Sequence, residues 1–488
     1  MFGKPIGRIC LTVLLLASLL TGASLASPRQ AEAAAGVRYE SKTVMYNGKS
    51  FSLQYAVIDV KNPYLRVMSV TAKEGIGHDE SLASIVNRTG ATVAVNGTFF
   101  DAYTTKDAER YPNGLLLNEG ETVFSGENQS LVIPVGKTPD IRKLSLKVKI
   151  TLTDAPSKRY TFSPWSVNRY YGASNQEQSV LFTRAFGEKV SFVGVKAVIK
   201  GGKIVTVTEG TATIPADGQV LLVGKADMNK RNILPYVKAG NLVDVTHTVL
   251  DLESGTTYDT EDYEAAVGVG PKLVTNGKMD VDPARDGFQD PKITTNAGAR
   301  SFAGIDAKGQ LVLGVSSAAT MKDLAGALIK LGLTDAMNLD GGASSGLYAE
   351  GAMKRTPGRE ISNAIVVKRY AKPQVQVFLN GKIVNEIYGY MEKDLTMVPL
   401  RGIFERLGAT MQWDSTGQVL TVQRGESRLV LRLNSRQAIV NGQAVQMDAA
   451  PVVTAGRTYV PLRFAVTALG GKVVWDNKLY RASITTPQ

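Results

Sequence analysis

An internal repeat in the C-terminal part of the chain constrains the fold more than any other feature. Residues 379–382 (Leu-Asn-Gly-Lys) align with residues 440–443 (Val-Asn-Gly-Gln) at an offset of 61. At an offset of 62, Val-Pro-Leu-Arg recurs at 398–401 and 460–463, and Trp-Asp recurs at 413–414 and 475–476. A nearly constant register across three motifs predicts two copies of one structural unit.

The order of motifs predicts the same short fold for each copy. Asn-Gly predicts a hairpin turn, Pro-Leu-Arg opens a short helix that stops at Leu-Gly, and a strand carrying Trp-Asp follows. We expect a duplicated β-β-α-β type module with units at 375–430 and 436–487, beginning after Pro373. Residues 374–487 resemble the copper amine oxidase N-terminal-like domain. They contain no His or Cys, so we expect no copper site but a binding or spacer module.

The N-terminus predicts export. Lys4 and Arg8 precede an apolar run that ends at Leu20, and small residues follow. This pattern is typical of a signal peptide, here over residues 1–26, with cleavage as late as residue 33 as the alternative. The run is too short to cross a bilayer and no later stretch is long enough, so we expect a protein that is not membrane-spanning. The expected location is secreted, either extracellular or cell-wall associated. The single cysteine, Cys10, lies within the predicted signal, which leaves no disulfides.

Charge suggests the partners. The formal net charge is +12, and removal of Lys4 and Arg8 leaves about +10. Outside a cell, a basic protein attracts an anionic cell-wall polymer, although the charge also fits solubility alone. The basic residues are dispersed and no recognition motif is present, so no nucleic acid partner is expected.

The region from 37 to 370 has mostly β-type patterns. Apolar runs at 91–95 and 219–223 predict strands. Helical periodicity is confined to a few segments, such as 81–88 and 321–331, the second with Thr320 and Asp323 as a capping pair. The predicted fold class is α+β, a mixed β-rich catalytic domain with few helices, followed by the duplicated module.

Four polar segments follow or precede apolar strands in this region, where side chains can converge on a pocket. They are 95–101 (Val-Asn-Gly-Thr-Phe-Phe-Asp), 296–306, 338–346 (Asn-Leu-Asp-Gly-Gly-Ala-Ser-Ser-Gly) and 359–364. Each one alone also fits an ordinary turn. Their order and spacing resemble the phosphodiester glycosidase family over about residues 80–370, with 181–187 and 268–274 as further points of similarity. Ala343 stands where that family often has a third glycine.

The resemblance implies a secreted hydrolase that cleaves the glycosidic bond of sugar-1-phosphodiesters, such as N-acetylglucosamine-1-phosphodiester, in cell-wall or exopolysaccharide material. The alternative is a non-catalytic protein that binds cell-wall polymer. Asp340, which follows an apolar stretch, is the expected catalytic carboxylate, and Arg300 the expected phosphate clamp because a guanidinium is a planar bidentate donor. Asp306 or Glu360 would be a second carboxylate. The expected substrate-binding residues are Asn96, Thr98, Gly341, Gly342, Ser344, Ser345, Arg359 and Asn363.

Other chemistries fit the sequence less well. Residues 342–346 match the G-x-S-x-G pattern of serine hydrolases, but that elbow needs a following helix and a downstream histidine. His78 and His247 both lie upstream, and His247 is expected to be a strand residue. The stretch 280–287 resembles a calcium loop with a misplaced glycine. The acidic cluster Asp259, Glu261, Asp262 and Glu264 fits either calcium or a solvated surface, so no cofactor and no metal are expected.

Overall fold

The computed structural model describes residues 36–105, 108–156, 158–454 and 456–486. The predicted signal peptide lies outside these residues. The described chain is β-rich, with 51% strand, 12% helix and six helices, as expected from the sequence. No helix of the described residues is long and apolar enough to cross a membrane.

The first sheet is antiparallel and seven-stranded. Its order is β1 (Val37–Tyr46), β2 (Lys49–Ile58), β23 (Leu311–Ala319), β22 (Gly298–Asp306), β24 (Leu333–Asn338), β20 (Lys272–Thr275) and β21 (Lys278–Met279). Helix α5 (Met321–Leu331) packs on it through Leu324 and Leu328, and the short helix α4 (Pro291–Thr294) precedes β22. The Thr320 hydroxyl accepts a hydrogen bond from the Asp323 amide, which caps α5 as predicted.

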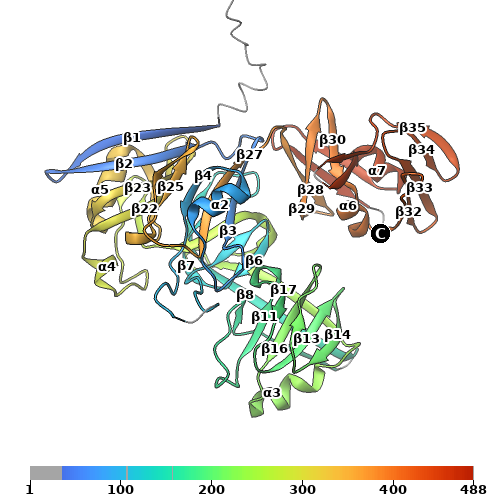
Figure 1. Ribbon diagram of the computed structural model, residues 1–488, viewed down its shortest axis with the longest axis horizontal. Helices are drawn as coiled ribbons and strands as arrows, with labels where there is room; N and C mark the ends of the chain where they lie inside the picture. Colours follow the sequence, from blue (N-terminus) through green and yellow to red (C-terminus); the bar gives the residue numbers. More distant parts are fainter. Residues whose placement is uncertain (1–35, 106–107, 157, 455, 487–488) are drawn as a thin grey trace, which may run out of the picture.

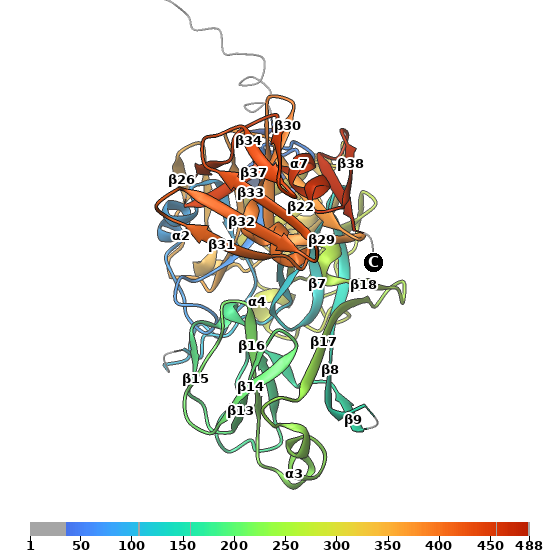
Figure 2. The ribbon, with the colours of Figure 1, turned by 90° about the vertical axis from the view of Figure 1, so that its right-hand side faces the viewer.

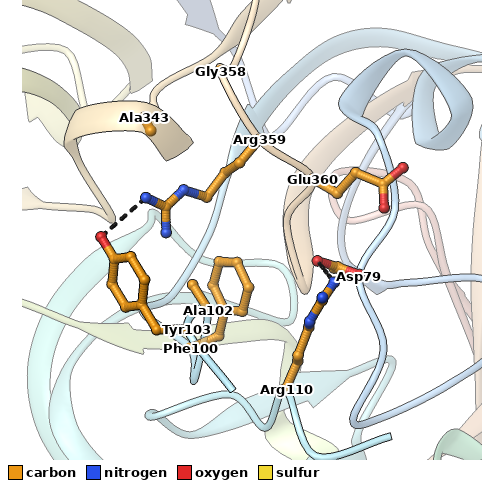
Figure 3. A pocket seen from close by; sticks show the side chains of 9 residues that line it. All are labelled: Asp79, Phe100, Ala102, Tyr103, Arg110, Ala343, Gly358, Arg359 and Glu360. Atoms are coloured by element: carbon orange, nitrogen blue, oxygen red, sulfur yellow. Dashed lines mark hydrogen bonds and ion pairs between the residues drawn. The ribbon is translucent and has the colours of Figure 1, made fainter. Parts of the chain in front are cut away.

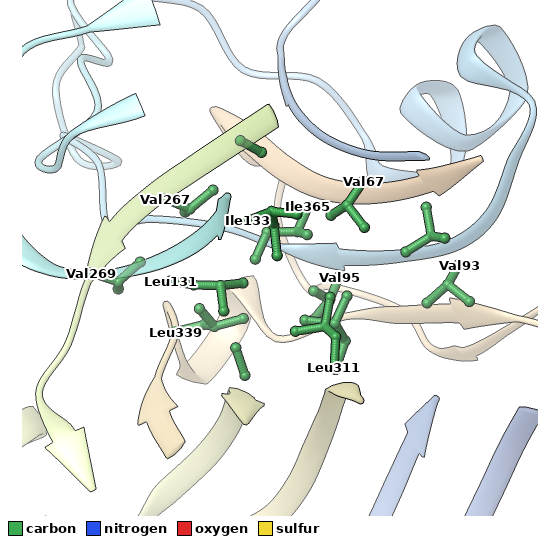
Figure 4. Packing of buried hydrophobic residues seen from close by; sticks show 14 of the residues in the cluster. Val67, Val93, Val95, Leu131, Ile133, Val267, Val269, Leu311, Leu339 and Ile365 are labelled. Carbon is green, nitrogen blue, oxygen red and sulfur yellow. The ribbon is translucent and has the colours of Figure 1, made fainter. Parts of the chain in front are cut away.

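The second sheet has five strands and faces the first across the main core. Its order is β26 (Ala352–Arg355), β25 (Leu347–Ala349), β4 (Ala91–Asn96), β27 (Asn363–Arg369) and β3 (Leu65–Thr71), with helix α2 (Leu82–Thr89) on its outer side. Figure 4 shows alternate side chains such as Val95, Ile365 and Leu311 meeting between the sheets. This alternation follows from the two-residue period of a strand. The predicted helix at 81–88 and strand at 91–95 are both confirmed.

A long third sheet extends from this core into a lobe that the sequence pattern did not predict (Figure 1). Strands β7 and β19 contribute Leu131 and Val267 to the main core, whereas the distal strands enclose a separate cluster around Ile150 and Leu221. The strand order is β10 (Ser166–Val167), β11 (Ser179–Phe182), β16 (Gly218–Val223), β13 (Val195–Lys200), β14 (Lys203–Thr208), β17 (Leu242–Asp251), β8 (Asp140–Ala155), β7 (Glu127–Pro134), β19 (Tyr263–Val269), β5 (Leu116–Asn118) and β6 (Glu121–Phe124). Strands β9 (Lys158–Phe162) and β18 (Thr257–Asp259) pair at its side. Helix α3 (Asp227–Asn232), the pair β12 (Lys189–Val190) and β15 (Ala212–Thr213), and the 3₁₀ turns η1 (Arg184–Phe186), η2 (Leu234–Tyr236) and η3 (Thr260–Asp262) complete this part.

The C-terminal residues form two further sheets around their own core (Figures 1 and 2). One contains β36 (Val452–Thr454), β37 (Arg457–Pro461), β30 (Leu395–Pro399), β29 (Lys382–Glu392), β28 (Gln374–Leu379), β39 (Arg481–Thr485) and β38 (Lys472–Asp476). The other contains β31 (Thr410–Asp414), β32 (Val419–Arg424), β33 (Ser427–Arg432), β34 (Gln437–Val440) and β35 (Gln443–Gln446). The predicted hairpins are present at Asn380-Gly381 and Asn441-Gly442, where both residues of each pair have positive φ. The predicted helices are α6 (Leu400–Arg406) and α7 (Leu462–Ala468).

Candidate active site

The ends of four strands bring the four polar segments together. Strand β4 ends at Asn96, opposite Ala364 at the start of β27, and β24 ends at Asn338, opposite Phe302 near the start of β22. The two sheets are joined at this edge because the Asp340 amide donates a hydrogen bond of 3.0 Å to the Gly97 carbonyl. Four segments that are separate in sequence therefore meet at one place.

Asn96 connects these segments from the inside. Its Nδ2 donates to the Asp340 carbonyl at 2.6 Å, and its Oδ1 accepts hydrogen bonds from the Ser301 hydroxyl at 2.6 Å and the Gly346 amide at 3.0 Å. The side chain is fully buried. The amide is thus occupied in holding three loops in place, because a buried polar group needs such partners.

Thr98 and Asn363 have the same kind of role. The Thr98 hydroxyl donates to the Gly268 carbonyl at 2.5 Å, and Asn363 Oδ1 accepts from the Thr98 amide at 2.9 Å. Asn363 Nδ2 donates to the Ser362 hydroxyl at 2.7 Å, and both residues are buried. In this structure Asn96, Thr98 and Asn363 connect and position the loops from the inside, and a contact of these residues with substrate stays a prediction.

Asp340 lies at the centre of the convergence, and its side chain is partly buried. Its Oδ1 accepts a hydrogen bond from the Gly341 amide at 2.8 Å, and the Ser344 side chain also hydrogen-bonds to the carboxylate. Burial raises the pKa of Asp340 to about 6, against the opposing effects of these two hydrogen bonds and of the Arg359 charge. A carboxyl group with this pKa changes protonation state near neutral pH.

The loop after Asp340 turns tightly through η4 (Gly342–Ser344). Gly342 has a φ of 61°, a conformation that suits glycine. Ala343 is not among the residues with positive φ, so its methyl group fits where the family often has glycine. Ser344 and Ser345 are buried, and the Ser345 hydroxyl has no hydrogen-bond partner in the described part of the chain.

The serine-elbow alternative does not fit this geometry. Ser344 leads through a short turn into strand β25, not into a long helix. His247 lies in strand β17 of the third sheet, as predicted, and its Nδ1 shares a hydrogen bond of 3.0 Å with the Thr122 hydroxyl. Burial lowers the pKa of His247 to about 4.

Arg300 is buried with most of its donors already used. Nε donates to the Ala319 carbonyl at 2.9 Å, and Nη2 donates to the carbonyls of Lys292 and Asn296 at 3.0 and 2.6 Å. Only Nη1 remains, beside Gly341. In this structure Arg300 therefore fixes the segment around α4 against β22, and its role as a phosphate clamp stays a prediction that only Nη1 could serve without loss of these bonds.

A pocket of about 410 Å³ opens beside this loop (Figure 3). Its wall is formed by Asp79, Phe100, Ala102, Tyr103, Arg110, Ala343, Gly358, Arg359 and Glu360. Arg110 is paired with Asp79. Arg359 has no carboxylate ion-pair partner among the described residues, and its Nη2 donates to the Tyr103 hydroxyl at 3.0 Å. Arg359 is therefore the pocket cation that is available to an anionic ligand.

Tyr103 and Lys292 extend the basic character of the pocket mouth. The Arg359 guanidinium lies 4.8 Å and the Lys292 ammonium 5.4 Å from the centre of the Tyr103 ring. The hydrogen bond from Arg359, with the charges of Arg359 and Lys292, lowers the pKa of Tyr103. The sequence prediction missed Tyr103, Arg110 and Lys292, although Tyr103 follows the Asn-Gly-Thr-Phe-Phe-Asp motif by only two residues.

The two candidates for a second carboxylate lie in different places. Glu360 is exposed on the pocket wall. Asp306 is at the opposite end of β22 from Arg300, where its Oδ1 accepts hydrogen bonds from the amides of Lys308 and Gln310 at 2.9 and 2.8 Å. Asp306 therefore holds a turn in this structure and is not among the residues that line the pocket.

The acidic side chains of the predicted calcium-like loop form bonds within the protein. In the stretch 280–287, Asp280 pairs with Arg285 at 2.7 Å, and Asp286 accepts from the Lys272 amide at 2.9 Å. Across the described ranges, no group of three His, Cys, Asp or Glu side chains is placed to hold a metal ion.

Two solved structures share this fold, and a third is more weakly similar. A hypothetical protein from Synechocystis matches with a TM-score of 0.56 and 21% identity. The match covers 68% of this chain and 62% of the length of that protein. A protein from Burkholderia pseudomallei K96243 matches with a TM-score of 0.53 and 18% identity, over 65% of this chain and 74% of the other. The catalytic domain of zebrafish N-acetylglucosamine-1-phosphodiester alpha-N-acetylglucosaminidase matches with a TM-score of 0.35 and 14% identity, over 68% and 83%. No curated protein matches significantly.

Two family profiles match the sequence. Residues 193–368 match phosphodiester glycosidase, and residues 378–484 match the copper amine oxidase N-terminal domain. The first match contains Arg300, Asp340 and Arg359, whereas Asn96 and Tyr103 lie before it. Both resemblances inferred from the motifs are confirmed. The chain therefore contains a region similar to the phosphodiester glycosidase family, residues 193–368, followed by a region similar to the copper amine oxidase N-terminal domain, residues 378–484.

Proposed function

We propose that this protein hydrolyses the glycosidic bond of sugar-1-phosphodiesters, with Asp340 as the reacting carboxylate and Arg359 as the phosphate-binding cation. The observation that carries the proposal is the position of Asp340 where the four segments meet, electrostatically coupled to the one pocket arginine of the described residues that lacks a carboxylate partner. The matched phosphodiester glycosidase region supports the reaction class.

Asp340 would react in its ionised form. The bond between the anomeric carbon and the phosphate oxygen breaks, and its electron pair leaves with the phosphate, which is a stable anion without a proton from the enzyme. In one route Asp340 takes a proton from the attacking water as the water bonds to the anomeric carbon. In the other, Asp340 bonds to the anomeric carbon as the phosphate leaves; a water then attacks that carbon, the bond to Asp340 breaks with its electron pair returning to the carboxylate, and the proton of the water passes to the solvent. The two routes give opposite anomeric products. A single well-placed carboxylate is sufficient for either route.

Arg359 would supply charge and geometry. A guanidinium offers a planar pair of donors that suits a phosphate, and its hydrogen bond to the exposed Tyr103 is easily exchanged for one to a ligand. Lys292 would add long-range attraction at the pocket mouth.

The test is release of sugar from a panel of sugar-1-phosphodiesters by the intact protein. Asp340→Asn should lower kcat at least about 1000-fold, and Arg359→Ala should raise KM by about 10- to 100-fold. The KM of Arg359→Lys should lie between those of the wild-type protein and Arg359→Ala. Asp306→Asn is the matched control and should retain activity. Wild-type turnover in both Asp340→Asn and Arg359→Ala would reject the assignment.

The same proposal includes export and attachment to a cell-wall or exopolysaccharide substrate. The predicted signal peptide, the net charge of +12 and the C-terminal module support it. Elements at an offset of 62, such as α6 and α7, support an internal duplication in that module. The rival is a non-catalytic wall-binding protein, which the charge and module also favour. Removal of residues 374–488 separates the two, because retained hydrolysis with lost wall retention indicates an enzyme with an anchor.

A further inference from the structure

Most of the exposed aromatic side chains lie near the pocket. Across the described residues, four aromatic side chains are exposed to solvent: Tyr103 at 76%, Trp165 at 47%, Tyr171 at 39% and Trp413 at 50%. Trp413 belongs to the C-terminal module. The other three are connected to the pocket wall, and we call Tyr103, Tyr171 and Trp165 the aromatic row.

A chain of contacts links the members of the aromatic row. Tyr103 lines the pocket, and Asp101, two residues earlier, forms an ion pair with Arg169 at 3.6 Å. The Arg169 guanidinium lies 5.6 Å from the centre of the Tyr171 ring. Trp165 then meets Tyr171 edge to face, with 5.7 Å between ring centres. The row therefore leads from the pocket onto the neighbouring surface of the third sheet.

Hydrogen bonds to buried groups fix the loop that carries Trp165 and Tyr171. Asn168 is fully buried, and its Nδ2 donates to the Val123 carbonyl at 2.8 Å and to the Thr183 hydroxyl at 2.9 Å. The Trp165 amide donates to the Ser179 carbonyl at 2.8 Å, and the Tyr171 amide donates to Gln178 Oε1 at 3.0 Å. A loop fixed in this way presents its rings in a preformed arrangement, which reduces the entropy lost on binding.

The chemistry of the aromatic row suits sugar rings. One face of a pyranose presents C–H groups, which pack on the electron-rich face of an aromatic ring. Arg169 and Asp101 lie between the rings and can bond to hydroxyl groups. We propose that the aromatic row binds successive sugar units of an oligosaccharide or polysaccharide whose phosphodiester end occupies the pocket. This inference rests on the proposed function and defines its substrate as a glycan chain.

The test compares a short and a long substrate. The short one is a methyl sugar-1-phosphodiester, and the long ones are hexasaccharides of N-acetylglucosamine, glucose or mannose with the same phosphodiester at the reducing end. Trp165→Ala combined with Tyr171→Ala should raise KM for the preferred hexasaccharide by at least about 10-fold, since two aromatic faces that pack on sugar rings are removed. The kcat and the KM for the short substrate should not change. Trp413→Ala is the matched control and should behave as wild type.

Direct binding separates this inference from the proposed function. Calorimetric titration of the wild-type protein with the three hexasaccharides does not require hydrolysis. Binding that is lost in the Trp165→Ala, Tyr171→Ala variant supports the aromatic row even if no substrate is cleaved. The inference is overturned if the wild-type protein binds none of the hexasaccharides, if the variant binds as well as wild type, or if KM rises equally for short and long substrates.

Discussion

Asp340→Asn should stabilise the protein at neutral pH while it removes activity. Burial raises the pKa of Asp340 from its ordinary 3.8 to about 6. The folded state then holds this proton more tightly than the unfolded state between those two values, so stability falls as the pH rises from about 4 to 6 and is level above that. Asparagine has no charge to bury, and it can still accept the hydrogen bonds from Gly341 and Ser344.

The size of the effect follows from the same linkage. The ionised carboxylate costs about 3 kcal/mol of folding stability at pH 7.5 and about 1 kcal/mol at pH 4.5. These are upper values, since Asp340 keeps partial contact with water, and we expect about half of each. For a region of this size, 1 kcal/mol corresponds to roughly 2–4 °C in Tm.

Scanning calorimetry of the intact protein at pH 7.5 and 4.5 measures this difference. The C-terminal sheets have their own core and give an internal reference. Asp306→Asn replaces a carboxylate that caps a turn, and should show no comparable gain at pH 7.5. A lower Tm for Asp340→Asn than for wild type at pH 7.5, or a difference that is the same at both pH values, would refute the reasoning.

Three further predictions follow from the site. Arg300→Ala should lower stability by at least about 3 kcal/mol, because three backbone carbonyls lose a charged donor; an unchanged denaturation midpoint would contradict this. Gly342→Ala should cost about 1–2 kcal/mol from its φ of 61° alone, since an added Cβ meets no neighbour, and Gly342→Asn should cost less in the same denaturation assay. Finally, kcat/KM should rise about tenfold per pH unit up to a pH of about 6 and then level off, because the ionised form of Asp340 reacts; a decline above pH 6 would instead identify Asp340 as a proton donor.

Local patterns predicted the elements that depend on local chemistry. The helices α2 and α5 have a capping residue and an apolar face in sequence, and both are present. The Asn-Gly pairs predicted hairpins because both residues adopt positive φ, which few other pairs do easily. The strand at 219–223 was predicted and is β16, but the lobe around β13 and β16 was not, since pairs such as β17 with β8 join segments far apart in sequence that no local pattern specifies.

The sequence predicted that the four segments meet, but not which side chains face the pocket. Asn96 and Asn363 are polar residues at strand ends. Both point inward only because β4 pairs with β27, where Asn96 bonds to the Asp340 carbonyl and Asn363 to the Thr98 amide. Asp306 lies in the same strand as Arg300, but six residues of a strand extend about 20 Å. Tyr103 reaches the site from a loop and Lys292 from the single-turn helix α4, and hydrophobic periodicity does not predict the position of either segment.

The two arginines show why a residue type alone does not identify a ligand contact. Arg300 and Arg359 have the same donors, but Arg300 gives two of its three nitrogens to backbone carbonyls, one of them in a buried hydrogen bond to Ala319 and two in part-buried ones. To bind a phosphate with those nitrogens, Arg300 would have to give up these three hydrogen bonds. Arg359 gives up only a hydrogen bond to an exposed phenol, so it can change partner when a ligand arrives. The number of hydrogen bonds that each guanidinium must give up, three for Arg300 and one for Arg359, therefore favours Arg359 as the one that binds a ligand.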